Sequence, residues 1–106
     1  MSYTVEITES CEQDLEEIAL YISENNPQVA IEFVDKIVDN LEKQLSLMPL
    51  SAPLITRQLP EEYLEYQGKL RKLVFKKRTL SYYYVDEKEK TVVVLHTKRS
   101  WKPINL

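Results

Sequence analysis

The chain has 106 residues, of which 43% are hydrophobic and 29% are charged. This length suits one domain that can bury a core, and this composition excludes an intrinsically disordered chain. No apolar run approaches the roughly 18–20 residues that a membrane-spanning helix needs, and the acidic first segment lacks the features of a signal peptide. With a single cysteine, these features predict one cytoplasmic domain over residues 1–106, without membrane contact.

The net charge of −3 is distributed unevenly along the chain. Residues 1–66 hold three bases against fourteen acids, whereas residues 67–106 hold eleven bases against three acids. This asymmetry indicates an acidic half and a basic half that contacts an anionic partner. Neutralisation of one half by the other within the fold explains the charges equally well.

Alternating β-forming residues predict a strand over residues 3–8. The hydrophobic period then becomes helical, with an apolar stripe running from Cys11 to Ile22 and a cap at Thr8 or Ser10. Asp14 and the other acids of this segment fall off the stripe. We interpret them as a solvated face that could also receive a basic partner segment.

A second helix is predicted to begin at Pro27 with Asn26 as its cap. Its apolar stripe runs over residues 30–45, and Pro49 prevents the helix from continuing. Because only a very short turn separates the two predicted helices, they should form an antiparallel hairpin.

The rest of the chain predicts β-structure. Residues 49–62 carry three prolines and indicate a connecting loop, with a short extended piece at residues 54–57, and Gly68 marks a turn. Strands are predicted over residues 70–77, 79–86 and 91–97, and their short connections indicate an antiparallel meander. The predicted fold is therefore a two-layer α+β domain: an N-terminal strand, a helix hairpin, and a three- to four-stranded antiparallel meander. The helices should cover one face of the sheet and leave the other to water or a partner.

His96 is the only histidine and the only side chain whose ordinary pKa lies near neutrality. It could act as a general acid or base, but a hydrogen-bonded structural histidine is the favoured interpretation. Simple alternation places it on the same strand face as Val92 and Val94, opposite Val93 and Thr97.

Basic residues of the last third, interleaved with aromatic residues, form the candidate target-binding surface. Its predicted members are Arg71, Lys72, Lys76, Lys77, Arg78, Lys98, Arg99 and Trp101. A solvated sheet face with buried aromatic side chains is the alternative interpretation. No cofactor or metal site is predicted, because one glycine cannot build a phosphate loop and Cys11 lies far from His96. Cys11 itself is predicted to lie in the core.

The ordered set of segments resembles a known family. It comprises YTVEIT at 3–8, DLEEIALYI at 14–22, NP opening a helix with AIEFVDKIVDNL, the closing MP, LRKLVF at 70–75, SYYYVD at 81–86 and VVVLHTKRS at 92–100. Together these segments resemble the RelE/ParE toxins of type II toxin–antitoxin systems over nearly the whole chain. The resemblance implies growth inhibition, plasmid stabilisation, and a cognate antitoxin that forms a hetero-oligomer with the toxin.

The resemblance also implies one of two targets. RelE-like toxins are metal-independent endonucleases that cleave mRNA on the ribosome, and the candidate catalytic residues would then be Arg71, Arg78, His96 and Arg99. ParE-like toxins inhibit DNA gyrase and are not enzymes. A third possibility is a non-toxic family member that only binds its antitoxin.

The ParE-like branch is favoured. Thr79 stands where RelE-like members carry a catalytic arginine, Arg78 is one position off, and no tyrosine follows Arg99. The long helix hairpin and the His-x-x-Arg pattern from His96 to Arg99 resemble the ParE-like branch. A sequence isoelectric point near 5.2 also favours a protein target or a purely local basic patch, because the acidic helices would repel nucleic acid.

Overall fold

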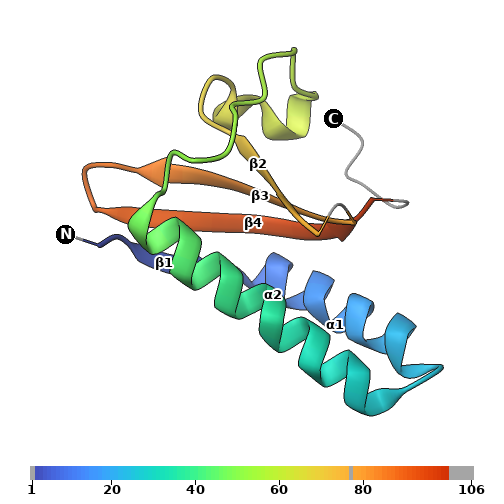
Figure 1. Cartoon of the computed structure of the whole chain (residues 1–106). Helices are drawn as coiled ribbons and strands as arrows, with labels where there is room; N and C mark the ends of the chain where they lie inside the picture. Colours follow the sequence, from blue (N-terminus) through green and yellow to red (C-terminus); the bar gives the residue numbers. More distant parts are fainter. Residues whose placement is uncertain (1, 77, 101–106) are drawn as a thin grey trace.

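The computed structural model describes residues 2–76 and 78–100 and arranges them in two layers (Figure 1). Two helices lie against one face of a four-stranded sheet, and a short 3-10 helix lies on the other side. In chain order, the elements are β1 (Thr4–Ile7), α1 (Glu9–Ser23), α2 (Pro27–Leu47), η1 (Glu61–Tyr66), β2 (Arg71–Phe75), β3 (Thr79–Asp86) and β4 (Thr91–Arg99). This arrangement confirms the predicted α+β fold.

The helix hairpin forms where the sequence predicts it. Thr8 caps α1, because its Oγ1 accepts the N–H of Cys11 at 3.2 Å. Asn26 caps α2 in the same way, through the N–H of Val29 at 3.2 Å, and the proline that follows begins the helix. Within the part of the chain that the structure describes, no helix is long and apolar enough to cross a membrane.

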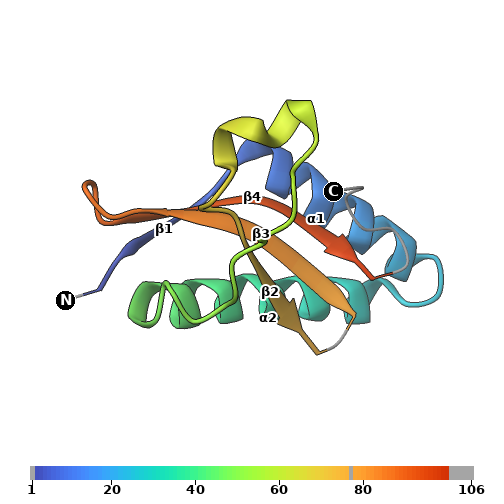
Figure 2. The ribbon, with the colours of Figure 1, turned by 90° about the horizontal axis from the view of Figure 1, so that it is seen from above.

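The strand order in the sheet is β1-β4-β3-β2. Strands β2, β3 and β4 form the predicted antiparallel meander, whereas β1 lies parallel to β4 at the edge of the sheet (Figure 2). Pairing of β1 with β4 runs from Thr4 opposite Thr91 to Ile7 opposite Val94. Among the described residues, no strand pairs with the outer edge of β4 beyond Val94, and α1 packs against β4.

The alternation that the sequence predicts along β4 is wrong. Tyr82 pairs with His96, but the next residue, Tyr83, pairs with Val94, so one residue of β4 is skipped as a bulge. The bulge reverses the alternation that follows it. Thr97, rather than His96, is consequently buried on the helix side with Val94.

Apolar side chains are buried on both faces of the sheet. The helix side holds the larger cluster, which includes Cys11, Leu15, Ile37, Leu41, Leu45, Tyr83, Val92 and Val94. This position confirms the prediction that Cys11 is a core residue. On the other face, Leu59, Leu70 and Tyr82 form a second cluster beneath side chains of residues 55–66. The expectation of a fully open second face is therefore wrong, because η1 and the chain before it cover part of the sheet.

Candidate functional site

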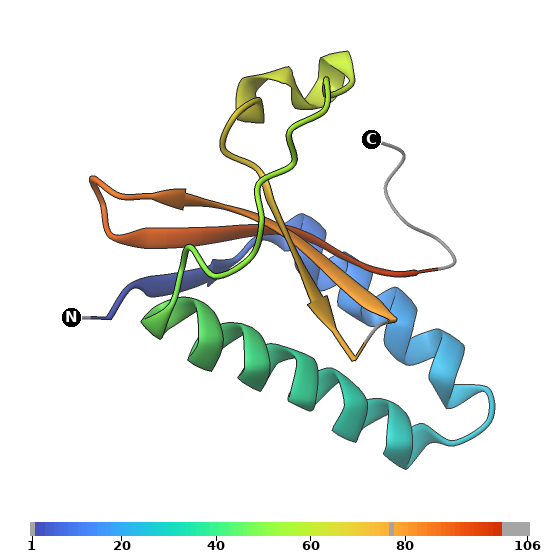
Figure 3. The same cartoon turned by 45° about the horizontal axis from the view of Figure 1, so that its top comes forward.

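Three of the predicted basic residues lie at the end of the sheet where β2 leads into β3 and where β4 ends. At this end the β2 and β3 strands lie over α2 (Figure 3). Arg78 and Arg99 are neighbours there, because Thr79 pairs with Arg99 and the N–H of Ser100 donates to the carbonyl of Arg78 at 2.7 Å. Lys76, with a positive φ of 51°, makes the turn between the strands. We call the surface formed by Lys76, Arg78 and Arg99 the basic end.

Two aromatic rings support the basic end. The Cζ atom of Arg99 lies 4.9 Å from the ring centroid of Phe33, and the Nζ atom of Lys76 lies 5.6 Å from that of Phe75. The centroids of these two rings are 6.5 Å apart. Each cation can therefore be attracted to a ring face, which favours a fixed position at the end of the sheet.

The basic end concentrates positive charge. Burial and the neighbouring Arg78 lower the pKa of Arg99, although a guanidinium stays charged at neutral pH. Two like charges held side by side repel one another, and a bound anionic group would relieve this repulsion. The geometry thus suits binding of a carboxylate- or phosphate-bearing partner.

A buried carboxylate organises the adjoining part of β4. Asp14 of α1 is only 5% exposed and accepts hydrogen bonds from His96 Nδ1 at 2.8 Å and from Lys98 Nζ at 2.6 Å. It also accepts the backbone N–H of Thr97 at 3.1 Å. Asp14 therefore supplies, at the outer edge of β4, an acceptor for the Thr97 N–H that a neighbouring strand would otherwise provide.

The Asp14 carboxylate raises the pKa of Lys98 and decides which ring nitrogen of His96 carries a hydrogen toward it. Burial acts to lower the pKa of Lys98, but the hydrogen bond and negative charge of Asp14 outweigh it and raise the pKa. Because a carboxylate only accepts, His96 Nδ1 must carry a hydrogen, and Nε2 is the other ring nitrogen. The ring of Tyr63 meets the His96 ring edge-on, with centroids 6.3 Å apart.

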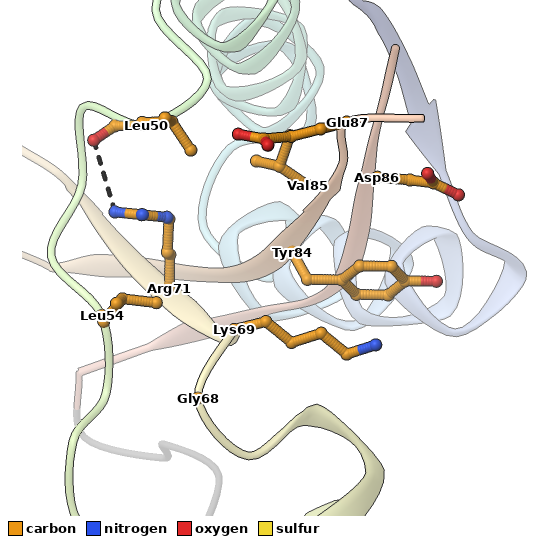
Figure 4. A pocket seen from close by; sticks show the side chains of 9 residues that line it. All are labelled: Leu50, Leu54, Gly68, Lys69, Arg71, Tyr84, Val85, Asp86 and Glu87. Carbon is orange, nitrogen blue, oxygen red and sulfur yellow. Dashed lines mark hydrogen bonds between the residues drawn. The ribbon is translucent and has the colours of Figure 1, made fainter. Parts of the chain in front are cut away.

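Arg71 and Lys72 lie at the opposite end of β2. Arg71 Nη1 donates to the carbonyl of Ala52 at 2.7 Å and to that of Leu50 at 3.3 Å (Figure 4). Lys72 borders a shallow hollow formed with residues 53–57. Four positions separate Arg71 from the end of β2, roughly 13 Å at about 3.3 Å per residue, so this arginine is remote from the basic end.

The structure thus divides the predicted surface into three places. Lys76, Arg78 and Arg99 meet at the basic end, and His96 and Lys98 meet at Asp14. Arg71 and Lys72 lie at the start of β2, where Lys72 is two strands from His96 in the row through Tyr82. Lys77 and Trp101 fall outside the described residues. Within the ranges that are described, no three histidine, cysteine or acidic side chains are grouped to hold a metal ion.

Asp14 is the residue that sequence reasoning missed. Its predicted place on a solvated face is wrong, because it is buried against β4. A signal for this was present: Asp14 lies three residues after Cys11 and four before Ile18, which places it at the border of the apolar stripe. Tyr63 gave no such signal, since its position depends on η1.

Two solved structures share this architecture. A chain of the toxin–antitoxin complex RelBE2 from Mycobacterium tuberculosis is 20% identical, with a TM-score of 0.67, over 96% of this chain and 95% of that one. A chain of the chromosomal ParDE toxin–antitoxin system from P. aeruginosa is 19% identical, with a TM-score of 0.68, over 92% of this chain and 95% of that one. The fold is therefore of the RelE/ParE type.

The sequence identifies the family within this class. The profile described as ParE toxin of type II toxin-antitoxin system, parDE, matches residues 5–101, which is most of the chain. The protein belongs to the ParE toxin family of type II toxin–antitoxin systems. None of the curated proteins compared with the chain is similar to it in sequence.

Proposed function

We propose that the chain is the toxin of a type II toxin–antitoxin pair, that a cognate antitoxin neutralises it, and that it acts by binding DNA gyrase rather than by cleaving mRNA. The observation that carries this proposal is the separation of the four candidate catalytic residues. Arg78 and Arg99 lie at the basic end, whereas His96 is hydrogen-bonded to Asp14. Arg71 is hydrogen-bonded to the loop after α2, at the far end of β2.

RNA cleavage by a ribose 2′-hydroxyl requires these groups to act together. A base must accept the hydroxyl proton, cations must stabilise the phosphorane, and an acid must protonate the leaving oxygen. All three must reach one phosphate. An arginine displaced by roughly 13 Å along β2 is poorly placed to do so. A compact basic end beside acidic helices instead suits an anionic patch on a folded protein.

An mRNA endonuclease is the second candidate, and one contact favours it. Asp14 orients the His96 ring so that Nε2 is the basic nitrogen, which is the arrangement of a carboxylate-assisted general base. Lys98 beside it could stabilise negative charge on a phosphate.

Two assays on the purified chain separate these candidates. Titrating the chain into a gyrase supercoiling reaction should block supercoiling. Adding the chain to translating ribosomes should produce no new mRNA 5′ ends, as measured by primer extension. Cleaved mRNA, lost in His96→Ala, would establish the nuclease instead.

In cells without antitoxin, induced expression should cause filamentation and a DNA damage response. Unimpaired growth would contradict both toxic functions and leave a family member that only binds its antitoxin.

A further inference from the structure

Four large apolar side chains are exposed to solvent around the end of α2. The exposed fractions are 71% for Leu47, 58% for Met48, 51% for Leu50 and 40% for Leu54. All four fall within eight residues of sequence, and we call them the apolar patch. Single exposed apolar residues are common, but a group of this kind on a folded domain marks an interaction surface.

The loop that carries the apolar patch is held firmly to the sheet. The Tyr83 hydroxyl donates to the carbonyl of Pro49 at 2.8 Å and accepts the N–H of Ala52 at 3.4 Å. Further along, the N–H of Ile55 donates to the carbonyl of Leu70 at 2.8 Å. Because these bonds already fix the backbone, a partner that covers the patch does not have to order the loop first.

A hollow of about 530 Å³ adjoins the patch, and Leu50 and Leu54 form part of its wall (Figure 4). The remaining lining residues are Gly68, Lys69, Arg71, Tyr84, Val85, Asp86 and Glu87. The basic side chains belong to the start of β2 and the residues just before it, whereas the acidic ones belong to the end of β3 and the turn after it. In Figure 4, Val85 and the ring of Tyr84 lie between the basic and the acidic side chains, and Leu50 and Leu54 lie on either side of Arg71.

Among the described residues, neither Lys69 nor Arg71 forms an ion pair with a carboxylate of the hollow. The Arg71 hydrogen bonds go to backbone carbonyls, and the Lys69 ammonium lies 5.2 Å from the ring centroid of Tyr84. Glu87, on the acidic side, is exposed to solvent. Both signs of charge are therefore offered to whatever covers the apolar centre.

We propose that this surface binds a second copy of the chain in a two-fold symmetric dimer. An interface of this symmetry must be self-complementary, because each copy contributes the same patch. An apolar centre with cations on one side and anions on the other satisfies that condition, since a two-fold axis through the centre places the basic side of one copy on the acidic side of the other. A partner segment of one charge sign would meet like charge on one of the two sides.

The oligomeric state of the purified chain tests the role of the apolar patch. Sedimentation velocity should show a dimer, and Leu50→Ser with Leu54→Ser should raise the dimer dissociation constant at least about tenfold. Leu64→Ser is the matched control, because Leu64 is similarly exposed but lies outside the hollow, and it should leave the constant unchanged. A wild-type chain that stays monomeric at about 1 mM would overturn the proposal. A monomeric wild type together with a double variant that no longer binds the antitoxin would also overturn the proposal. This result would assign the surface to the antitoxin.

A charge exchange tests the two-fold arrangement itself. Lys69→Glu and Glu87→Lys should each weaken the homodimer, because each places like charges across the axis. An equal mixture of the two variants should form a heterodimer, in which both charge contacts are restored. Glu89→Lys is the control for charge, since Glu89 lies in the same turn but does not line the hollow. Two variants that dimerise like the wild type, or a mixture that stays monomeric, would contradict the arrangement.

Discussion

Asp14 Oδ2 lies 2.8 Å from His96 Nδ1 and links helix α1 to strand β4 across 82 positions of sequence. The same carboxylate group binds Lys98 Nζ and the backbone N–H of Thr97. These bonds fix the part of β4 that extends beyond β1 and leads to the basic end. The position of Arg99, two residues after Thr97, therefore depends on a side chain from the opposite layer of the domain.

Replacing Asp14 should destabilise the fold. Asp14→Asn keeps one acceptor oxygen, but it removes the negative charge and turns the other acceptor into an NH2 donor that faces His96 and Thr97 or Lys98, which should lower the free energy of unfolding by about 1–3 kcal/mol. The lower part of this range is the more relevant, since the side chains of His96 and Lys98 are each about one-quarter exposed and regain water. Urea denaturation gives the value. Glu16→Gln removes an exposed charge from the same helix and should change it by less than about 0.5 kcal/mol; equal stability of the two variants would contradict the role of Asp14.

The stability of the protein should fall between pH 9 and pH 11 because of Cys11. Burial raises the pKa of this thiol from 9.0 to about 11, against the opposing hydrogen bond with Thr97. Over this interval the unfolded chain has lost the thiol proton while the folded chain retains it, so rising pH favours unfolding. Two pKa units correspond to about 2–3 kcal/mol.

Urea midpoints measured from pH 8 to pH 11 check this expectation against Cys11→Ala. The variant should begin less stable, because it loses core contacts, but its stability should fall less over the interval. Tyrosines also ionise in this range, and they do so in both proteins. Parallel pH profiles for the wild type and the variant would show that the thiol has no such effect.

Much of the fold follows from local sequence signals. Thr8 and Asn26 cap their helices as predicted, and the apolar stripes lie on the sheet, because capping and helical periodicity involve residues close in sequence. The parallel pairing of β1 with β4 is different, since it joins residues about 87 positions apart, and the β4 bulge depends on how β4 pairs with β3. A period of two cannot reveal a skipped residue, which is why simple alternation groups His96 with Val92 and Val94 although the bulge separates it from them.

The candidate site was predictable as a composition but not as an arrangement. Counting bases directs attention to the last third of the chain. The count could not show that Arg71 is hydrogen-bonded to the loop after α2, or that Arg78 and Arg99 are neighbours, because both depend on how the strands pair. Asp14 was missed because a single acid at the border of an apolar stripe has the same pattern whether it is solvated or buried.

The Tyr83 hydroxyl should be responsible for most of the order in the loop after α2. Tyr83→Phe removes the donor to the Pro49 carbonyl and the acceptor of the Ala52 N–H, at a cost of about 1–2 kcal/mol in unfolding free energy. Amide hydrogen exchange at residue 52 should accelerate more than exchange in β4. Tyr84→Phe is the control, because no hydrogen bond of its hydroxyl to this loop is present. Unchanged exchange at residue 52 would mean that the other hydrogen bonds of the loop, from Arg71 and Ile55, hold it without the Tyr83 hydroxyl.

If the chain inhibits gyrase through the basic end, a charge reversal there should weaken inhibition. Arg78→Glu places an acid beside Arg99 without removing a side-chain hydrogen bond that supports the fold, because the bond from Ser100 involves the backbone of Arg78. Like charges across an interface cost several kcal/mol, so the concentration needed to block supercoiling should rise about tenfold or more. Lys72→Glu makes the same change near the start of β2, opposite Tyr82, and should leave inhibition within about twofold of the wild type, which corresponds to less than about 0.5 kcal/mol. Both variants should have urea unfolding midpoints close to that of the wild type, which would show that the fold is intact. Inhibition that depends on Lys72 and not on Arg78 would place the target contact at the other end of β2.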